Sequence, residues 1–530
     1  MSVGNVYEQV LSGVGQAFDP SPPPRPRPSG SVVLWRRNAA AEVEVYWVRR
    51  SPLLRFMGGW HAFPGGGLAP VDLDTPVQGR PKDVDEPFDP ADVPGADDGD
   101  LPPTMIDGLS ACTLRELFEE TGVLVHTVDS KPDRAAVRDA RRKLIDQKIG
   151  FPGVLHNLET KLDASRLTYA GRWVTPAFST IRFDARFFLL EWPLDEELQP
   201  EVWRGELDHG EWIRPAEAIQ RWRRAEALLG QPNLHILRVL LREGPERGLE
   251  HLRPGGDEGP APHRIEFRRD ISAIPQRTRT LPPATHTSAY LIGTRELALV
   301  DPGSGDADQI ERLKRAVQAA AKRDGGIVKA IWLTHHHPDH VGGANAMRQA
   351  LGVPVCAHPL TAERLESRGI EVDQPLMDGQ TIVLAGDPNL TIQVLHTPGH
   401  ARGHLCFFEE GSRTLIAGDM IAGHSTIIID PPEGDMDQYL HSLARLIGLQ
   451  PKTLLPAHGS MLANAVERLQ ALYNHRLRRE QQVLEAWKQG VHDPVEMLAS
   501  VYADIQAHEY PLAERQIVAH ILRLRKLGMI

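Results

Sequence analysis

Residues 334–340 constrain the fold of this chain more than any other stretch, because they read Thr-His-His-His-Pro-Asp-His. They follow an apolar, strand-like run at 327–333 and lead into a pair of glycines, Gly342 and Gly343. On a turn that leaves a buried strand, these side chains can converge on a metal ion. Imidazole nitrogen and carboxylate oxygen are ligands that suit zinc in a hydrolytic site. An exposed His-rich loop is the alternative interpretation.

Three distant polar residues favour the metal site. His400, Asp419 and His458 each follow a short apolar run, at 391–395, 414–416 and 453–455 respectively. If these runs are strands of a packed sheet, their ends present the three side chains along one edge of that sheet. The sequence therefore predicts that all of these residues meet at one place.

The ordered set H-x-H-x-D-H, followed by His, Asp and His, resembles the metallo-β-lactamase fold over about residues 265–465. The resemblance implies two zinc ions and a zinc-bound hydroxide as the nucleophile, with the metals stabilising the developing oxyanion. The implied ligands are, for one metal, His335, His337 and His400; for the other, Asp339, His340 and His458; and for both, as a bridge, Asp419. His336 is expected to point away, since alternate residues on an extended stretch face opposite ways.

A second candidate site lies at residues 115–123, which read Arg-Glu-Leu-Phe-Glu-Glu-Thr-Gly-Val. On a helix, Glu116, Glu119 and Glu120 share one face, and Gly122 stands where a helix C′ residue is expected. Clustered carboxylates repel one another unless cations lie between them, and hard oxygen ligands suit Mg²⁺ or Mn²⁺. A solvated amphipathic helix is the alternative interpretation.

Together with the Phe-Pro-Gly-Gly motif at 63–66, this run resembles a Nudix box split by an insert. The resemblance covers about residues 30–240, although Asp72 stands where the usual box has a glutamate. It implies that Glu116, Glu119 and Glu120 hold Mg²⁺ on a diphosphate and that Arg115 orients a carboxylate. Either Glu206 or Glu211 is expected to supply a further acid.

The spacing of Arg50 and Arg55 before this box resembles the signature of Nudix coenzyme A diphosphatases. The two arginines would bind phosphate, because guanidinium pairs well with phosphate oxygens. Gly65 and Gly66 allow a close approach of the backbone to a ligand. The split box resembles the peroxisomal branch of those enzymes.

The sequence predicts a multidomain protein of the α/β and α+β classes. We expect a proline-rich, extended leader at 1–29, a Nudix α/β/α sandwich at 30–244 with a loose acidic insert at about 73–106, a linker at 245–263, a metallo-β-lactamase αββα sandwich at 264–466, and a winged-helix-like helical tail at 467–530. The formal charge of −11 argues against nucleic-acid binding by the whole surface. Three widely spaced cysteines, and no apolar run long enough to cross a membrane, predict a cytoplasmic protein without disulfides or a membrane partner.

The tail resembles that of the compact lactamase-beta-like endoribonucleases. Its basic residues would touch phosphates, or the tail packs on the sheet domain or forms a homodimer contact; these residues are Arg515, Arg523, Arg525 and Lys526.

The predicted function is that of a bifunctional metal-dependent hydrolase. The Nudix half is expected to cleave a nucleoside diphosphate linkage, with coenzyme A or acyl-CoA favoured. The lactamase half is expected to hydrolyse phosphodiesters in single-stranded RNA. Two alternatives stay open: a glyoxalase II-like thioesterase in the lactamase half, or a nucleic-acid-binding regulator with a winged helix and inactive hydrolase folds.

Overall fold

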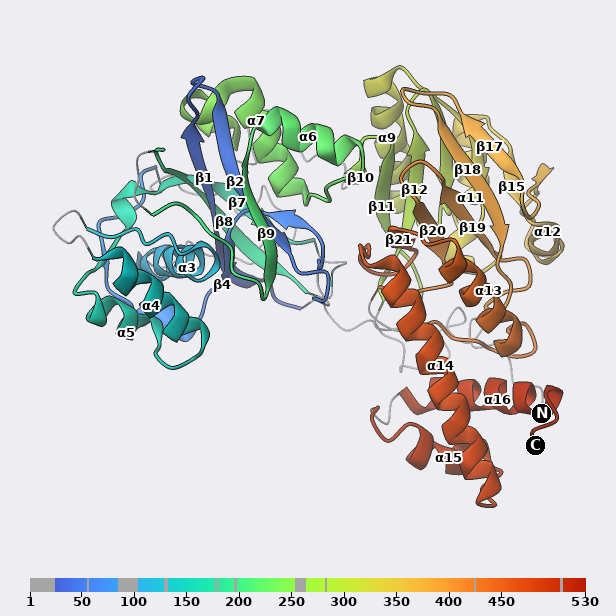
Figure 1. Cartoon of the computed structure of the whole chain (residues 1–530). Coiled ribbons are helices and arrows are strands. Elements are labelled where there is room, and N and C mark those ends of the chain that lie inside the picture. The colour runs from blue at the N-terminus through green and yellow to red at the C-terminus, as the bar shows by residue number, and fades with distance from the viewer. Residues whose placement is uncertain are drawn as a thin grey trace. The chain divides into compact units, whose positions relative to one another are not determined.

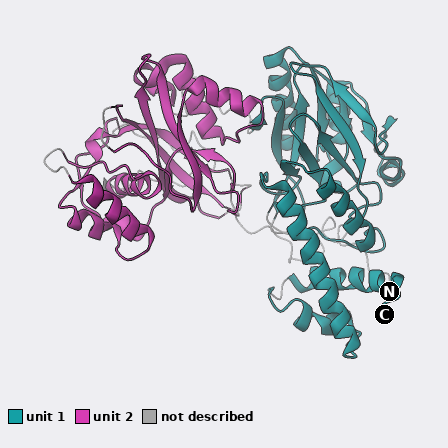
Figure 2. Ribbon diagram, viewed as in Figure 1, with its two compact units in different colours: residues 1–22, 262–530 teal, residues 23–261 magenta. Residues whose placement is uncertain are grey.

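The computed structural model describes residues 24–54, 57–83, 103–127, 132–176, 179, 181–194, 198–252, 264–281, 284–423, 426–505 and 509–530. Two compact units make up the chain: one spans Pro23–Ala261 and the other contains Pro262–Ile530 (Figures 1 and 2). Each unit has hydrophobic cores of its own.

A seven-stranded mixed sheet forms the centre of the N-terminal unit. Its order is β3-β2-β1-β8-β7, with β4 pairing with β1 and β9 with β2. The strands are β1 (Arg27–Arg37), β2 (Val43–Arg50), β3 (His61–Ala62), β4 (Gly65–Gly67), β7 (Thr168–Val174), β8 (Phe183–Glu191) and β9 (Leu207–Ile213). The strands β1 and β2 pair antiparallel, whereas β1 and β8 run parallel.

Alternation along β1 builds a sandwich with helices on both faces of this sheet. Val32 and Leu34 pack on one side with α3 (Pro103–Thr121), α4 (Arg134–Ile145) and α5 (Phe151–Asn157). Val33 and Trp35 pack on the other with α6 (Pro215–Arg223), α7 (Gln231–Arg247) and α8 (Leu249–Leu252). Successive strand side chains point to opposite faces. Each fully buried apolar side chain stabilises the fold by about 1.5–3 kcal/mol.

The predicted leader is wrong at its end. Residues 27–29 belong to β1, which lies between β2 and β8 and is therefore a central strand. Pro28 has no N–H to donate, but its carbonyl accepts a hydrogen bond from the amide of Leu68 at 2.9 Å. Residues 1–23 lie outside the described part of the chain.

The predicted loose insert is wrong at both ends. Its start lies in α2 (Pro70–Asp74) and in β5 (Val77–Gln78), which pairs with β6 (Leu162–Asp163). At its other end, α3 begins at Pro103. Residues 84–102 lie outside the described part of the chain.

Two sheets form the core of the C-terminal unit. One has the order β10 (Ile265–Arg268), β11 (Ile271–Arg277), β12 (His286–Gly293), β13 (Glu296–Val300), β14 (Ile327–Trp332), β15 (Val355–Ala357) and β16 (Gln374–Pro375). The other has the order β17 (Thr381–Leu384), β18 (Leu390–His396), β19 (Leu405–Glu409), β20 (Thr414–Gly418) and β21 (Thr453–Pro456). The rings of Trp332 on β14 and Phe407 on β19 lie 5.1 Å apart and join the two sheets.

Helices cover the outer faces of both sheets, which gives the predicted αββα sandwich. The first sheet packs with α9 (Ala307–Asp324), α11 (Ala344–Leu351) and α12 (Pro359–Glu366), through residues such as Leu313 and Val317. The second packs with α13 (Met436–Gly448), through Tyr439 and Leu443. The three cysteines are buried and free, as the sequence predicts.

Three helices form the described tail: α14 (Ala465–Lys488), α15 (Pro494–Val501) and α16 (Tyr510–Lys526). They share a small core of their own, which includes Val483, Met497 and Ile517. Residues 464–505 and 509–530 contain no strand, so the described tail lacks the wing of a winged helix. Among the described helices, none combines the length and the apolar character that a membrane span requires.

Candidate functional sites

The predicted ligands of the C-terminal unit all follow the ends of strands. Residues 334–340 follow β14 and run into α10 (Pro338–Val341), whose first turn carries Asp339 and His340. His400, Asp419 and His458 follow β18, β20 and β21. The strands before His400, Asp419 and His458 belong to one sheet, as the sequence predicts, whereas β14 belongs to the other sheet. Facing ends of two packed sheets bring the residues together.

The first group of ligand atoms is formed by His335, His337, His400 and Asp419. Nδ1 of His337 lies 2.8 Å from Nε2 of His335 and 3.0 Å from Nε2 of His400. Oδ2 of Asp419 lies 3.4 Å from Nε2 of His400. All four residues are buried. Such spacings suit ligands that surround one small cation at bond lengths of about 2 Å.

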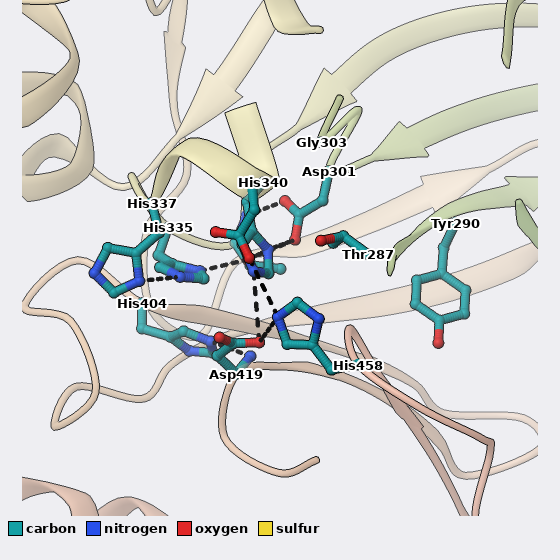
Figure 3. A network of polar contacts seen from close by, with 12 residues as sticks. Thr287, Tyr290, Asp301, Gly303, His335, His337, His340, His404, Asp419 and His458 are labelled. Carbon is teal, nitrogen blue, oxygen red and sulfur yellow. Dashed lines mark hydrogen bonds and ion pairs between the residues drawn. The ribbon is translucent and has the colours of Figure 1, made fainter. Parts of the chain in front are cut away.

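The second group is formed by Asp339, His340 and His458. Figure 3 shows His340 and His458 together with Asp419. Nε2 of His458 lies 3.5 Å from Oδ2 of Asp339. Oδ1 of Asp419 lies 3.3 Å from Nε2 of His458 and 3.5 Å from Nε2 of His340. The two carboxylate oxygens of Asp419 therefore face different groups, as a bridging ligand requires.

These residues fit a metal pair. Nε2 of His340 and Oδ1 of Asp419 are buried and make no hydrogen bond within the described structure. Leaving a buried polar atom without a partner costs about 1–3 kcal/mol. Because these two atoms lie 3.5 Å apart, one cation bound beside them would give both a partner.

A separate hydrogen bond at Nδ1 orients four of the histidine rings. Nδ1 of His335 lies 2.9 Å from Thr334 Oγ1, and Nδ1 of His340 lies 2.8 Å from Asp301 Oδ2. Nδ1 of His400 lies 2.8 Å from the Ile428 carbonyl oxygen, and Nδ1 of His458 lies 3.0 Å from that of His286. Each bond leaves Nε2 directed at the site, which is the usual arrangement around metal-binding histidines.

Asp301 fixes the loop that carries the first ligands. Its carboxylate accepts hydrogen bonds from the amide and the hydroxyl of Thr334, at 2.7 and 2.6 Å. Next to it, a Cβ on Gly303 would stand 2.1 Å from the carbonyl oxygen of Asp339, so only glycine fits this close approach. Asp301 thus has a structural role, since it holds both Thr334 and the ring of His340.

Burial and charge divide the histidines into two kinds. Burial holds the pKa of His335 and His337 well below the usual histidine value, so both rings are neutral and able to ligate. For His340 burial acts in the same direction, but nearby carboxylates, Asp419 first, raise its pKa well above the usual value. Burial alone would raise the pKa of Asp419, whereas His458 and His340 hold it well below its usual value.

The remaining histidines of this region belong to neither ligand group. His336 is buried, and its Nδ1 makes no hydrogen bond with the described residues. His404 accepts a hydrogen bond from the Asp419 amide at 3.0 Å and so holds the bridging residue. His358 caps α12 by accepting from the Leu360 amide at 3.3 Å.

The predicted glutamates of the N-terminal unit lie at the end of α3, beside the glycines of β4. Glu120 accepts a hydrogen bond from the Gly65 amide at 3.0 Å. A Cβ on Gly66 would stand 2.4 Å from Oε1 of Glu116, so a larger residue would push this carboxylate aside. In contrast to the histidine groups, these three glutamates do not offer one oxygen each within 4.8 Å of one another in the described structure.

The electrostatics of this face favour a cation. Burial first, and then the charges of Glu119 and Glu206, raise the pKa of Glu116 to about 7 against the lowering effect of Arg115. Burial likewise raises the pKa of Glu119, and it raises the pKa of Glu120 well above the usual value. Half-buried carboxylates whose charge is unfavourable in this way fit a hard divalent ion such as Mg²⁺ or Mn²⁺.

The structure separates the two candidates for a further acid. Glu211 bonds to Arg221 and to the indole of Trp47, at 2.6 and 3.2 Å. Glu206 acts on the pKa of all three box glutamates and lies 3.0 Å from Arg50. Of the two candidates, Glu206 is therefore the one whose charge acts on this face of α3. Arg55 lies outside the described residues.

Asp72 is the residue whose role the sequence leaves open. It forms a buried, two-pronged ion pair with Arg115, with Nε–Oδ1 and Nη2–Oδ2 distances of 2.7 and 2.9 Å. Arg115 also reaches Glu116 at 2.9 Å and Glu119 at 3.2 Å. An aspartate in α2 thus anchors the arginine that orients the glutamates.

Replacing Asp72 by alanine is expected to destabilise the N-terminal unit by about 3–5 kcal/mol, because it leaves Arg115 buried without its main partner. The measurement is urea unfolding of the full chain followed by tryptophan fluorescence, since most of the tryptophans lie in this unit. Asp74→Ala, at an exposed position of the same helix, is the matched control. Equal stability of the two variants would refute the anchoring role.

The folds and sites together define a chain that joins a Nudix domain to a metallo-β-lactamase domain. Residues 21–240 match the NUDT19 Nudix domain, and residues 282–458 match the metallo-beta-lactamase superfamily. Lactamase-like protein vrtG of Penicillium aethiopicum is 30% identical over 239 residues, which cover 44% of this chain and 72% of that protein. The chain belongs to the metallo-beta-lactamase superfamily.

Two further relatives match a smaller part of their own length. Lactamase-like protein aptB of Emericella nidulans is 31% identical over 199 residues, 37% of this chain and 59% of that protein. An atrochrysone carboxyl ACP thioesterase of Passalora fulva is 32% identical over 204 residues, 38% of this chain and 56% of that protein. The chain thus spans less than two thirds of these two relatives.

Proposed function

We propose that the chain is a hydrolase with two independent metal sites, and that its lactamase-type unit hydrolyses thioesters. The observation that carries the site is the position of Asp419 between the two groups of ligands. The thioester class is supported by two relatives that are named atrochrysone carboxyl ACP thioesterases, at 31% and 32% identity. The proposed substrates are acyl thioesters of coenzyme A or of an acyl carrier protein.

Hydrolysis of RNA has less support from the tail. Three of the four predicted basic residues contact carboxylates of the chain: Arg515 bonds to Asp430 at 2.6 Å, and Lys526 bonds to Asp437 at 2.8 Å. Arg523 also bonds to Asp437, at 3.2 Å. Phosphates would have to compete with these partners, so the packing role is the better explanation of the tail.

In this proposal His335, His337 and His400 hold one zinc ion, Asp339, His340 and His458 hold the other, and Asp419 joins them. When bound, the two ions supply Lewis-acid catalysis and acidify water. The protein's own part is to keep His335 and His337 neutral by burial, to orient four of the ligand rings through Nδ1, and to hold Asp419 through His404.

We propose that the Nudix unit cleaves a diphosphate linkage, with coenzyme A or acyl-CoA as the favoured substrate. Glu116, Glu119 and Glu120 would hold Mg²⁺ or Mn²⁺. Arg50 is the phosphate-binding candidate of the described residues, because its Nε is buried without a hydrogen bond there. A phosphate oxygen would satisfy this group.

A substrate screen with the full chain tests both halves. We expect hydrolysis of acyl-CoA and acyl carrier protein thioesters that requires zinc, and Mg²⁺-dependent release of phosphopantetheine from coenzyme A. Elemental analysis should find about two zinc ions per chain. Zinc-dependent cleavage of single-stranded RNA without thioester hydrolysis would overturn the thioester proposal. Retention of nucleic-acid affinity by Asp339→Ala, with no turnover by the parent protein, would indicate a binding regulator instead.

A further inference from the structure

The orientation of His400 depends on a stretch of backbone outside any helix or strand. Nδ1 of His400 bonds to the carbonyl of Ile428 at 2.8 Å, and residues 426–430 form no regular element. No ladder of backbone hydrogen bonds therefore holds Ile428 in place. Something else must fix it if the ring is to keep Nε2 directed at the first ligand group.

The tail helices hold both neighbours of Ile428. Gln516 of α16 accepts a hydrogen bond from the Ile429 amide and donates one to the Ile429 carbonyl, both at 3.3 Å. Arg476 of α14 donates to Gln516 at 2.9 Å and also to the carbonyl of Ile427. Gln516 and Arg476 are buried, so the contacts are shielded from water.

A third contact joins the tail to the next residue of this segment, Asp430. Arg515 bonds to the carboxylate of Asp430 at 2.6 Å, and both side chains are largely buried. Backbone groups at 427 and 429 and a side chain at 430 are thus tied to two helices of the tail. Buried polar groups of this kind are stable only when their partners stay in place, so they define one conformation of the segment.

We propose that Gln516 and Arg476, supported by Arg515, are positioning residues for the metal ligand His400. The tail then completes the metal site of the lactamase-type unit: it fixes Ile428, which fixes the imidazole. The inference rests on the proposed metal-binding function of this unit. It assigns to the buried tail residues a role that tail stability alone would not give them.

Arginine substitutions on one helix provide the matched test. Arg476 and Arg479 are both buried on α14, but Arg479 bonds to Asp504 at 2.8 Å and to the Val501 carbonyl, away from residues 427–430. The variants are Arg476→Met, Gln516→Leu and, as the control, Arg479→Met. Zinc affinity of the full chain is measured by competition with a chelator, together with the visible spectrum of the cobalt-substituted protein.

We expect Arg476→Met and Gln516→Leu to weaken the binding of one zinc ion by about tenfold, as for partners of metal-binding histidines, and to change the cobalt spectrum. Arg479→Met should bind both ions as the parent protein does. Where Gln516→Leu does not fold, Arg515→Met replaces it. Equal zinc affinity in all variants would overturn the positioning role while the proposed function stands. A parent protein that binds no zinc would overturn the proposed function and this inference with it.

Discussion

Asp419→Ala is expected to abolish hydrolysis by the lactamase-type unit and to leave the Nudix unit active. The two carboxylate oxygens of Asp419 face the two ligand groups: Oδ2 lies 3.4 Å from Nε2 of His400, and Oδ1 lies 3.3 Å from Nε2 of His458. Removing it takes a ligand from both metals, and a loss of several kcal/mol of transition-state stabilisation lowers the rate by about a thousandfold or more. Zinc content should fall from about two ions per chain to one or fewer.

The control is Asp308→Asn, because Asp308 is an exposed carboxylate on α9 that pairs with Arg277 at 3.3 Å. Both variants lose one negative charge in the same unit, so any effect of net charge is shared. An Asp419→Ala protein that keeps both zinc ions and its turnover would contradict the bridging role. Coenzyme A cleavage that fell together with thioester hydrolysis would contradict the independence of the two sites.

Sequence patterns place the predicted ligands at strand ends for a physical reason. A polar residue directly after a buried apolar run marks a strand end, and the predicted runs correspond to β14, β18, β20 and β21. The structure brings the predicted ligands together in two groups. The runs do not specify that β14 joins a different sheet from the other three strands, because pairing between strands depends on partners far along the chain. The two-sheet origin of the site was therefore not predictable from them.

Long-range polar contacts are the other part that sequence reasoning misses. Asp72 could be noticed because it stands at a fixed place after Gly66, although its ion pair with Arg115 is visible only in the structure. Gln516 offers no such signal, since it reaches Ile429 from 87 residues away and lies on the apolar side of a helix. A buried glutamine in an amphipathic pattern is the sole hint, and it names no partner.

The site of the Nudix unit is tested by Glu119→Gln, which keeps the size of the side chain and removes its charge. Glu119 is more exposed than Asp72 and Glu116, the other carboxylates that pair with Arg115, and it lies 3.2 Å from that arginine. We expect Mg²⁺-dependent cleavage of coenzyme A to fall by at least about a hundredfold, because a hard cation loses an anionic ligand. Thioester hydrolysis and zinc content should not change, since the zinc ligands belong to the other unit.

Binding of Mn²⁺, measured by electron paramagnetic resonance, separates a loss of metal from a loss of chemistry. Glu226→Gln, at an exposed site of the same unit 3.9 Å from Arg224, is the control for charge. Weaker Mn²⁺ binding by Glu119→Gln alone would place the cation on the face of α3. Unchanged Mn²⁺ affinity and unchanged cleavage would mean that the carboxylates of this helix serve the solvated, structural role that an amphipathic surface helix can also have.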